Sequence, residues 1–444
     1  MRALLATFAF LSLAAAAEAQ QPAVDQIVDQ ELPGLVATYK QIHAAPELST
    51  HEEKTSALLA QELRAMGYEV SDRIGVYKNP NWKGYGVVAV MRNGAGPTVL
   101  VRADMDALPV EEQTGLPYAS KVRAKNDAGV EVGVMHACGH DIHVTSLIGT
   151  ARTLAQLKGQ WRGTLVLIGQ PAEETIGGAR AMLADGLYSR FPKPDFALAL
   201  HDASDLETGK VGYTPGYALA SSTSVDVTIR GRGAHGSRPE ASKDPIVLAA
   251  EFIMAIQTIV SRERSPFDPA VVTVGSIHGG TRYNIIPDDV HLQLTIRTYK
   301  EEVRQEILAS LNRIATGLAT AAGIPADRAP ILQVNESTLP TYNDPALVKR
   351  VAGALIQALG AENVVERPPV MGSEDFGYFG LENRQIPVFM FTVGAIDHAR
   401  MEASRTSGTP LPSLHSSLFY PAPEPTIRTA VRAMTASVLE LMKK

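Results

Sequence analysis

Residues 163–174 read GTLVLIGQPAEE, an unbroken apolar run that ends in two adjacent carboxylates. Such a run is typical of a strand that is buried on both faces of a sheet. Helical patterns at about 143–157 and 177–185 flank it, and a second strand-like run follows at 196–201. Because strands alternate here with helices, the sequence predicts an α/β fold with a mostly parallel, two-sided sheet.

Two further strand-like runs, 86–91 and 98–103, lie on either side of Asn93-Gly94. The dipeptide Asn-Gly is a strong signal for a tight turn between strands. The sequence therefore predicts a hairpin or another tight connection at this point.

The pattern changes after Gly216, where polar and apolar residues alternate over 224–230 and indicate a half-exposed strand. The elements predicted from there on follow the order strand, helix, strand, strand, helix, strand. This order is that of the ferredoxin-like βαββαβ unit. We therefore expect a second domain, residues 219–338, inserted into a first domain made of residues 20–218 and 339–444.

The 444 residues include 45% hydrophobic and 20% charged side chains, a composition typical of a folded globular protein. The formal net charge of −6 gives no basic balance for phosphate contacts, so we expect no nucleic-acid partner. Cys138 is the single cysteine, and the chain can therefore form no intramolecular disulfide.

The N-terminus carries an apolar run from Ala3 to Ala17, preceded by Arg2 and overlapping the small-x-small pattern Ala17-Glu18-Ala19. This pattern is typical of a secretory signal peptide and its cleavage site. We interpret residues 1–19 as such a peptide and expect a secreted, periplasmic protein with no membrane partner after cleavage. The alternative is an uncleaved anchor at the membrane interface.

The segment 135–141 reads MHACGHD and contains three side chains that can bind a metal ion. If this segment is extended, His136, Cys138 and His140 share one face, because side chains in a strand alternate. A bound metal ion would hold Cys138 as a thiolate, although a lone cysteine is more commonly buried and inert. Packing or a backbone hydrogen bond is the simpler explanation for His136 and for His143, and we assign no function to His43.

Glu173 and Glu174 directly follow the buried strand, at the edge where α/β sheets bind ligands. Neighbouring side chains point in different directions, so one carboxylate can bind a metal ion while the other takes a proton from a water molecule. The alternative is a solvated pair that is stabilised by the start of a helix.

His201 ends another strand, and His415 lies in a proline-rich loop near the C-terminus. Five donors, Cys138, His140, Glu174, His201 and His415, are enough for two divalent ions if one of them is shared. Thiolate and imidazole suit Zn²⁺ best, and Mn²⁺, Co²⁺ or Ni²⁺ remain alternatives.

With these motifs the chain resembles the co-catalytic metallopeptidase family of aminoacylases, glutamate carboxypeptidases and succinyl-diaminopimelate desuccinylase. Within that family it is most similar to the amidohydrolase branch of hippurate hydrolases and plant auxin–amino acid conjugate hydrolases. The resemblance covers essentially the whole mature chain. It rests on the segments 102–109 (RADMDALP), 136–141 (HACGHD), 170–174 (QPAEE), 231–239 (GRGAHGSRP), 284–288 (NIIPD), 373–376 (SEDF) and 415–419 (HSSLF).

The resemblance implies two metal ions per subunit, with Cys138 as the ligand that bridges them. His140 and His201 would complete one metal site, and Glu174 and His415 the other. Glu173 would be the general base and then the general acid. Where most branches have a His-x-Asp motif this chain has Arg102-Ala-Asp104, so Asp104 would orient an imidazole through a hydrogen bond.

For the inserted domain the resemblance implies a lid that also forms a homodimer or a larger homo-oligomer. His235 would stabilise the oxyanion of the reaction, in its own or the partner subunit's site. Asn284 and Arg297 would hold the carboxylate of the substrate. The alternatives are that Asn284 forms a turn and that Arg297 is an exposed strand residue.

Together these features predict a secreted binuclear metal-dependent amidohydrolase. Its substrates would be N-acyl or N-aroyl amino acids of the hippurate type, or small dipeptides, from which it releases a free amino acid. One alternative is a non-catalytic binding protein for conjugated amino acids, but binding alone needs no base such as Glu173. The other is a purely structural metal site.

Overall fold

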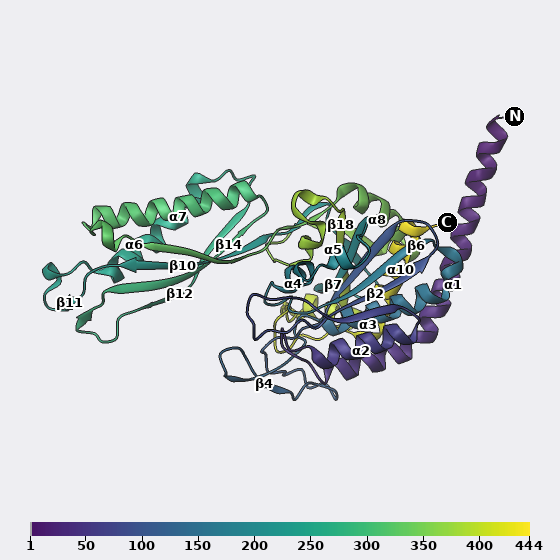
Figure 1. The fold of residues 1–444 in the computed structure, drawn as a ribbon, viewed down its shortest axis with the longest axis horizontal. Coiled ribbons are helices and arrows are strands. Elements are labelled where there is room, and N and C mark those ends of the chain that lie inside the picture. The colour runs from purple at the N-terminus through teal and green to yellow at the C-terminus, as the bar shows by residue number, and fades with distance from the viewer. Residues whose placement is uncertain (1) are drawn as a thin grey trace. The chain divides into compact units, whose positions relative to one another are not determined.

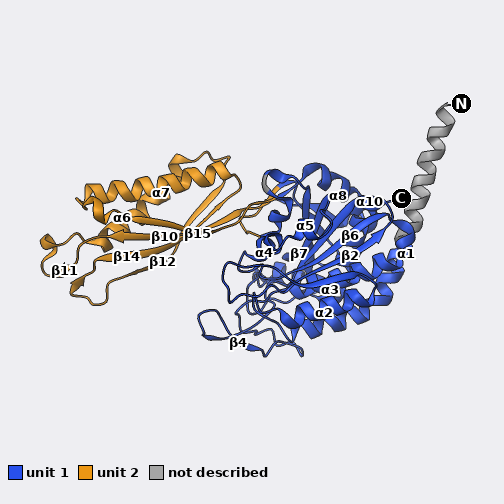
Figure 2. Ribbon diagram, in the orientation of Figure 1, with its two compact units in different colours: residues 1–216, 342–368, 375–444 blue, residues 217–341, 369–374 orange. Residues whose placement is uncertain are grey.

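The computed structural model describes residues 22–444, apart from the side chain of Glu382 (Figure 1). The predicted signal peptide, residues 1–19, lies outside the described residues. The chain divides into two units, which Figure 2 colours separately. Unit 1 consists of residues 1–216, 342–368 and 375–444, and unit 2 of residues 217–341 and 369–374. Unit 2 is thus slightly longer at both ends than the predicted insertion, 219–338, and also takes in 369–374.

Unit 1 is built on a sheet of eight strands in the order β1-β2-β6-β3-β7-β18-β8-β17. The strands are β1 (Glu69–Ile74), β2 (Gly86–Asn93), β3 (Thr98–Asp104), β6 (Gly163–Gln170), β7 (Phe196–Glu207), β8 (Val211–Tyr213), β17 (Val364–Glu366) and β18 (Val388–Ile396). The neighbouring strands β6, β3, β7 and β18 are mutually parallel. The predicted fold class, α/β with a mostly parallel sheet, is confirmed at the centre of the sheet, whereas β1 and β2 pair antiparallel.

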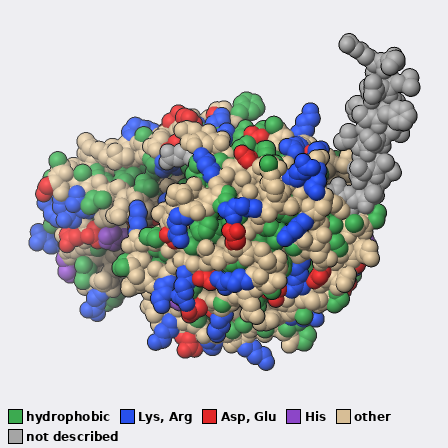
Figure 3. Space-filling view, turned by 45° about the vertical axis from the view of Figure 1, so that its right-hand side comes forward, with side chains coloured by type: hydrophobic (Ala, Val, Ile, Leu, Met, Phe, Trp, Pro, Cys, Tyr) green, Lys and Arg blue, Asp and Glu red, His purple; other side chains and the backbone are tan. Residues whose placement is uncertain are grey.

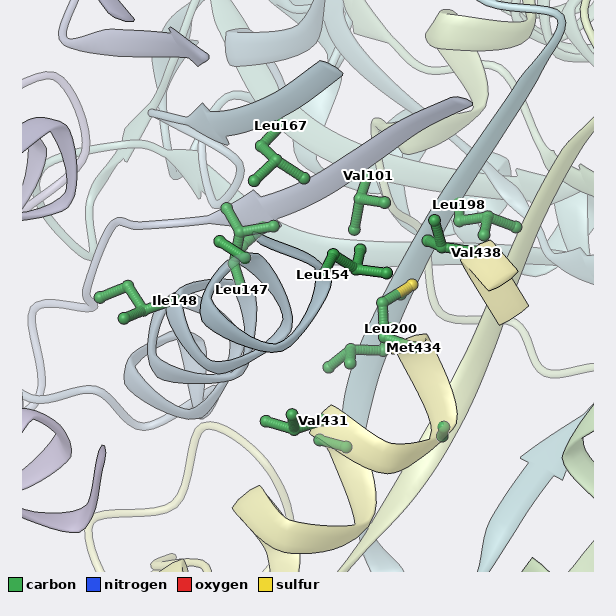
Figure 4. Close-up of a cluster of buried hydrophobic side chains, with 14 of the residues drawn as sticks. Val101, Leu147, Ile148, Leu154, Leu167, Leu198, Leu200, Val431, Met434 and Val438 are labelled. Atoms are coloured by element: carbon green, nitrogen blue, oxygen red, sulfur yellow. The ribbon is translucent and has the colours of Figure 1, made fainter. Parts of the chain in front are cut away.

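Helices cover the sheet because alternate side chains of its strands point to opposite faces. In β3, for example, Val99 and Val101 belong to the large buried cluster that the helices also enter. Figure 4 shows the centre of this cluster, where Leu147 and Leu154 of α3 and Met434 of α10 lie near Val101. The helices that enter it are α1 (Arg2–His43, described from residue 22), α2 (Glu53–Ala65), α3 (His140–Gln156), α8 (Pro345–Leu359) and α10 (Pro423–Met442).

The connection between β2 and β3 is tight, but the two strands do not form a hairpin. Strand β6 lies between them, antiparallel to β2 and parallel to β3. The side-chain amide of Asn93 donates hydrogen bonds to the carbonyls of Lys158 and Trp161, just before β6. Of the two predicted alternatives, the tight connection is therefore confirmed and the hairpin is not, because both strands pair with β6.

Unit 2 has the predicted order of strands and helices, β10-α6-β12-β14-α7-β15, and its sheet has the order β12-β14-β10-β15. All pairs in this sheet are antiparallel, as in the ferredoxin-like unit. The elements are β10 (Ser221–Arg230), α6 (Pro245–Thr258), β12 (Ala270–Gly279), β14 (Asp289–Thr298), α7 (Glu301–Ala321) and β15 (Ile331–Ser337).

One stretch of unit 2, Pro245–Glu263, is long and apolar enough to cross a membrane by length and composition. It contains α6, whose side chains Leu248, Phe252 and Ile256 are buried in the core between the helices and the sheet. Other apolar side chains of the stretch, Val247 and Met254 among them, are exposed, so it is buried on one side only. On the face shown in Figure 3, Lys and Arg side chains are interspersed with Asp and Glu.

The role of Asn93 can be tested by replacing it with alanine. Asn93→Ala removes the side-chain amide that donates hydrogen bonds to two backbone carbonyls. We expect this change to lower the free energy of unfolding by about 1–2 kcal/mol. Denaturant unfolding of both proteins measures this difference. An unchanged free energy of unfolding would mean that the turn does not depend on its contact with the chain before β6.

Candidate metal centre

The candidate site lies where the central parallel strands of unit 1 end. In the sheet register Asp104, at the end of β3, is opposite Gln170, at the end of β6. Glu173 and Glu174 follow β6 after two residues, and His201 lies in β7, the strand next to β3. The carboxyl ends of parallel strands meet at one edge of a sheet, which is where such sheets bind their ligands.

Cys138 and His140 reach this edge from the start of α3. The premise that residues 136–140 are extended was wrong, since Cys138 lies in a turn and His140 is the first residue of the helix. Gly139 has a φ of +74°, and a Cβ atom there would collide with the carboxylate of Asp202. A glycine is therefore required between the two candidate ligands.

The five predicted donors form two groups that share Cys138. The donor atoms of Cys138, His140 and His201 lie within 4.8 Å of one another, and so do those of Cys138, Glu174 and His415. The sulfur of Cys138 is 3.6 Å from Nε2 of His201 and 3.3 Å from Nε2 of His415. The buried thiol is thus shared by a group with two imidazoles and a group with one imidazole and one carboxylate.

His415 is held in place by its backbone. Its φ is +68°, a conformation that few residues other than glycine adopt, and its N–H donates to the carbonyl of Ala137 at 2.8 Å. Nε2 of His415 is 3.6 Å from Oε2 of Glu174, and the His415 side chain is 56% exposed. The second group of donors therefore opens to solvent on the His415 side.

Unpartnered buried atoms test whether a metal ion fits here. Within the described part of the chain, Nε2 of His140 and Oε1 of Glu174 are buried and have no hydrogen-bond partner. These two atoms are 3.8 Å apart. Buried polar atoms are almost always paired, and coordination to divalent cations would pair both. The donor set fits a metal centre.

Burial and nearby carboxylates shift the pKa values of the candidate ligands. Burial, reinforced by Glu174 and Glu173, raises the pKa of the Cys138 thiol well above its usual value. Burial also raises the pKa of Glu174 to about 7, against the opposing effect of His140. A divalent cation would reverse both shifts, because it favours the thiolate and the carboxylate.

Asp104 lies beneath these ligands and contacts His143. Burial disfavours its charge, but Arg102, with His140 and His143, holds the pKa of Asp104 well below its usual range. Asp104 Oδ1 is hydrogen bonded to Nδ1 of His143, and Nε2 of His143 is 3.2 Å from Asp202 Oδ1. The expected backbone hydrogen bond is present, since Nε2 of His143 accepts the N–H of Asp202 at 2.9 Å, and through Nδ1 the ring also contacts the buried carboxylate of Asp104.

Asp106 is a residue that the sequence analysis missed. Its carboxylate accepts hydrogen bonds from the backbone N–H groups of Glu173, at 3.0 Å, and Glu174, at 2.9 Å. It also lies 3.4 Å from Nδ1 of His140. The motif Asp104-Met-Asp106 was the available signal, because two aspartates that follow a buried strand lie at the ligand-binding edge.

Asp202 and the pair of His43 and Asp141 were also missed. The backbone carbonyl of Asp202 lies 2.7 Å from Nδ1 of His201, which leaves Nε2 of that ring facing Cys138. The buried His43 lies 2.7 Å from Asp141 and 3.1 Å from Glu112. No sequence pattern joins His43 to Asp141, so this contact could not be found before the fold was known.

The other three predicted site residues belong to unit 2. His235 is exposed, and its Nδ1 is 3.1 Å from the N–H of Ser237. The carbonyl of Asn284 accepts a hydrogen bond from Gly236 at 2.8 Å, next to His235. Arg297 donates to Ser373 at 2.7 Å. Their expected roles stay predictions.

The parallel sheet and the two donor groups around one thiol define an α/β protein with a candidate metal centre. Residues 100–408 match the peptidase family M20/M25/M40. The hippurate hydrolase of Campylobacter jejuni is 38% identical over 76% of this chain and 83% of its own length. An IAA-amino acid hydrolase of Arabidopsis thaliana, ILR1-like 4, is 35% identical over 87% of this chain and 80% of its own.

Two solved structures extend this similarity to the fold. An aminohydrolase of methicillin-resistant Staphylococcus aureus matches 96% of this chain and 100% of its own, at 30% identity and a TM-score of 0.81. A dinuclear metal-binding peptidase of family M20 from Bacillus subtilis matches 93% of this chain and 99% of its own, at 27% identity and a TM-score of 0.73. The chain therefore belongs to peptidase family M20/M25/M40. The predicted class of enzyme, a metal-dependent hydrolase of amide bonds, is confirmed.

Gly139 offers a test of the geometry at the start of α3. Gly139→Ala adds a Cβ atom against Asp202 at a residue whose backbone is in the left-handed conformation. We expect the free energy of unfolding to fall by more than about 1 kcal/mol, and we expect the protein to bind less metal. Elemental analysis and denaturant unfolding measure the two losses. Gly159→Ala is the matched control, since a Cβ atom there would meet nothing within 4 Å. A Gly139→Ala protein with normal metal content would contradict the geometry.

Proposed function

We propose that this enzyme hydrolyses N-acyl or N-aroyl amino acids, or small dipeptides, and releases a free amino acid. The names of similar proteins support this class of substrate, since they include hippurate hydrolase, N-acetylcysteine deacetylase and IAA-amino acid hydrolases. In each of these names an acyl group is joined to an amino acid through an amide. The observation that carries the proposal is the buried thiol of Cys138 between two groups of metal donors.

In this proposal Cys138 is a thiolate ligand shared by two divalent ions. His140 and His201 complete one site, and Glu174 and His415 the other. The mixture of one sulfur, three imidazoles and one carboxylate favours Zn²⁺, with Mn²⁺, Co²⁺ or Ni²⁺ as alternatives. When bound, such ions would polarise the amide carbonyl of the substrate and make the attacking water more acidic.

Glu173 is the proposed general base. Its Oε2 lies 4.0 Å from Nε2 of His140, at the edge of the donor cluster, and Asp106 holds its backbone N–H. A carboxylate in this place can take a proton from the attacking water and give it to the leaving amine. Glu173 is therefore proposed to move the proton twice in each turnover.

His235, Asn284 and Arg297 are proposed to complete the site from unit 2. His235 would hydrogen bond the oxyanion, and the other two would hold the substrate carboxylate. A homodimer formed through unit 2 would let His235 act in the partner's site. The free edge of β12, at the end of the sheet of unit 2, supports this proposal, because an edge strand can pair with a second copy.

Export to the periplasm is proposed from the sequence alone. The basis is the apolar run from Ala3 to Ala17 and the Ala17-Glu18-Ala19 pattern that ends it. N-terminal sequencing of the exported protein tests this proposal, which expects a chain that starts near Gln20.

Removal of metal should abolish hydrolysis of the amide. We expect dialysis against a chelator to stop cleavage of hippurate, and addition of Zn²⁺, Mn²⁺ or Co²⁺ to restore it, because the ions acidify the attacking water. Release of glycine is measured alongside elemental analysis. Full turnover by protein that contains no metal would contradict the proposal.

Glu173 and Glu174 should fail in different ways although they are adjacent and chemically identical. Glu173→Gln should keep two metal ions and lose about 10²–10⁴-fold in kcat, the usual effect of losing a general base. Glu174→Ala should instead lose metal from one site. Metal stoichiometry by mass spectrometry and steady-state kinetics separate the two roles. If Glu173→Gln lost a metal ion and Glu174→Ala kept both, the assignments would have to be exchanged.

A further inference from the structure

The loop that carries Glu173 and Glu174 is held in a strained conformation. Ala172, directly before Glu173, has a φ of +54°, and Ile176 has a φ of +56°. Residues other than glycine adopt this left-handed conformation only when their surroundings impose it. The direction in which Glu173 points therefore depends on contacts made by the backbone of this loop.

Those contacts come from two buried carboxylates on distant segments, Asp106 and Glu52, and a third, Asp375, binds the start of the next helix, α4 (Gly178–Ala184). Asp106 accepts the N–H groups of Glu173 and Glu174. Oδ2 of Asp375 accepts a hydrogen bond from the N–H of Ala179 at 2.9 Å. Glu52 accepts the N–H of Ala172 at 2.8 Å, across 120 residues of sequence. The N–H next to the strained φ of Ala172 is thus bound by Glu52.

Glu52 is placed for this contact by the start of α2. Its side chain is fully buried, and its Oε1 also accepts the N–H of Thr50 at 2.9 Å. Thr50 itself has a φ of +67°, so one oxygen atom joins two strained residues from separate segments. Both of these hydrogen bonds go to backbone groups, which is the pattern of a residue that fixes the course of a chain.

The carboxyl group of Glu52 accepts both hydrogen bonds through one oxygen atom, Oε1. Burial, together with the nearby Asp106, raises its pKa well above the usual value, which favours the neutral acid. Its second oxygen, Oε2, has no hydrogen-bond partner in the described part of the chain. An amide of the same shape could therefore accept the same two hydrogen bonds through its oxygen.

We propose that Glu52 is a positioning residue for catalysis, which fixes Ala172 and thereby aims the carboxylate of Glu173. This inference rests on the proposed role of Glu173 as general base. Glu52 acts through the backbone and is not proposed to touch the substrate or a metal ion. Displacing a catalytic base by about 1 Å can lower the rate about 10²-fold. We therefore expect loss of the Glu52 contact to lower kcat.

Three substitutions at one position separate positioning from simple support of the fold. Glu52→Ala removes the acceptor, and Glu52→Asp withdraws it by one methylene group. We expect both to lower kcat by about 10²-fold, with KM and the content of two metal ions unchanged. Glu52→Gln keeps the acceptor, and we expect its kcat to stay within about threefold of the unsubstituted enzyme, since a neutral hydrogen bond replaces a similar one.

The neighbouring Glu53 is the matched control. Its side chain is 60% exposed and pairs with Arg73 on the surface, so Glu53→Ala should leave kcat and metal content unchanged. The assay uses the full enzyme loaded with Zn²⁺ and hippurate as substrate. A Glu52→Ala or Glu52→Asp enzyme with unchanged kcat would overturn the proposal, and so would a Glu52→Gln enzyme as slow as Glu52→Ala.

Metal content and folding complete the set of outcomes. If kcat and bound metal fell together in Glu52→Ala and Glu52→Asp, Glu52 would support the metal centre and not Glu173. If neither variant folded while Glu52→Gln did, Glu52 would support the fold. Either outcome would overturn the proposal.

Hydrogen exchange gives a readout that does not need activity. We expect peptides that cover residues 171–177 to exchange faster in Glu52→Ala than in the unsubstituted protein or in Glu53→Ala, because the N–H of Ala172 loses its acceptor. An unsubstituted enzyme that cleaved no N-acyl amino acid would refute the proposed function, whereas unchanged exchange would refute the contact itself.

Discussion

Buried negative charge at the edge of the sheet is the constraint on which the rest of this site depends. Asp104, Asp202 and Glu174 surround the thiol of Cys138, and each of them disfavours its ionisation. Uncompensated buried charges cost several kcal/mol each. Arg102 compensates Asp104 from beneath through a buried ion pair. Burial also disfavours the charged forms of two candidate ligands, Cys138 and Glu174, and divalent cations would compensate both.

The same carboxylates also shape the backbone that presents the ligands. Asp106 binds two successive N–H groups of the loop that carries Glu173 and Glu174, and Asp202 fills the space left by the missing side chain of Gly139. Catalytic groups act efficiently only when their supporting contacts hold them close to the productive geometry. In this enzyme the support is built from hydrogen bonds between side chains and backbone, which link the ends of β3, β6 and β7 to the start of α3.

The sequence predicted well those structural features that show as patterns of neighbouring residues. The apolar runs of β6 and β7 and the βαββαβ order of unit 2 are patterns of neighbouring residues, and both were confirmed. Residues Cys138, His140, Glu174, His201 and His415 were proposed from donor chemistry together with a family resemblance, and the fold brings their donor atoms together. At Asn93-Gly94 the predicted tight connection was confirmed, and its alternative, a hairpin, was not, because both strands pair with the distant strand β6.

The supporting residues were out of reach for the same reason. Asp202, His43 and Glu52 each contact a group that lies far away in the sequence, and a single buried acid or histidine has no periodic signal. His136, which an extended segment would have placed beside Cys138, is buried, and neither ring nitrogen has a hydrogen-bond partner within the described residues. Whether a side chain faces a ligand is therefore decided by the turn at Cys138-Gly139, which only the fold reveals.

The central claim, that one thiolate serves two metal ions, is tested most directly by X-ray absorption at the zinc edge. The enzyme is loaded with two equivalents of Zn²⁺ per chain, and the sulfur atoms around the average zinc ion are counted. Because Cys138 is the single cysteine, a shared thiolate predicts about one sulfur per zinc, at about 2.3 Å. A count of about one sulfur for every two zinc ions would show that Cys138 binds one ion alone, and no sulfur at this distance would show that it binds neither. Either result would contradict the account.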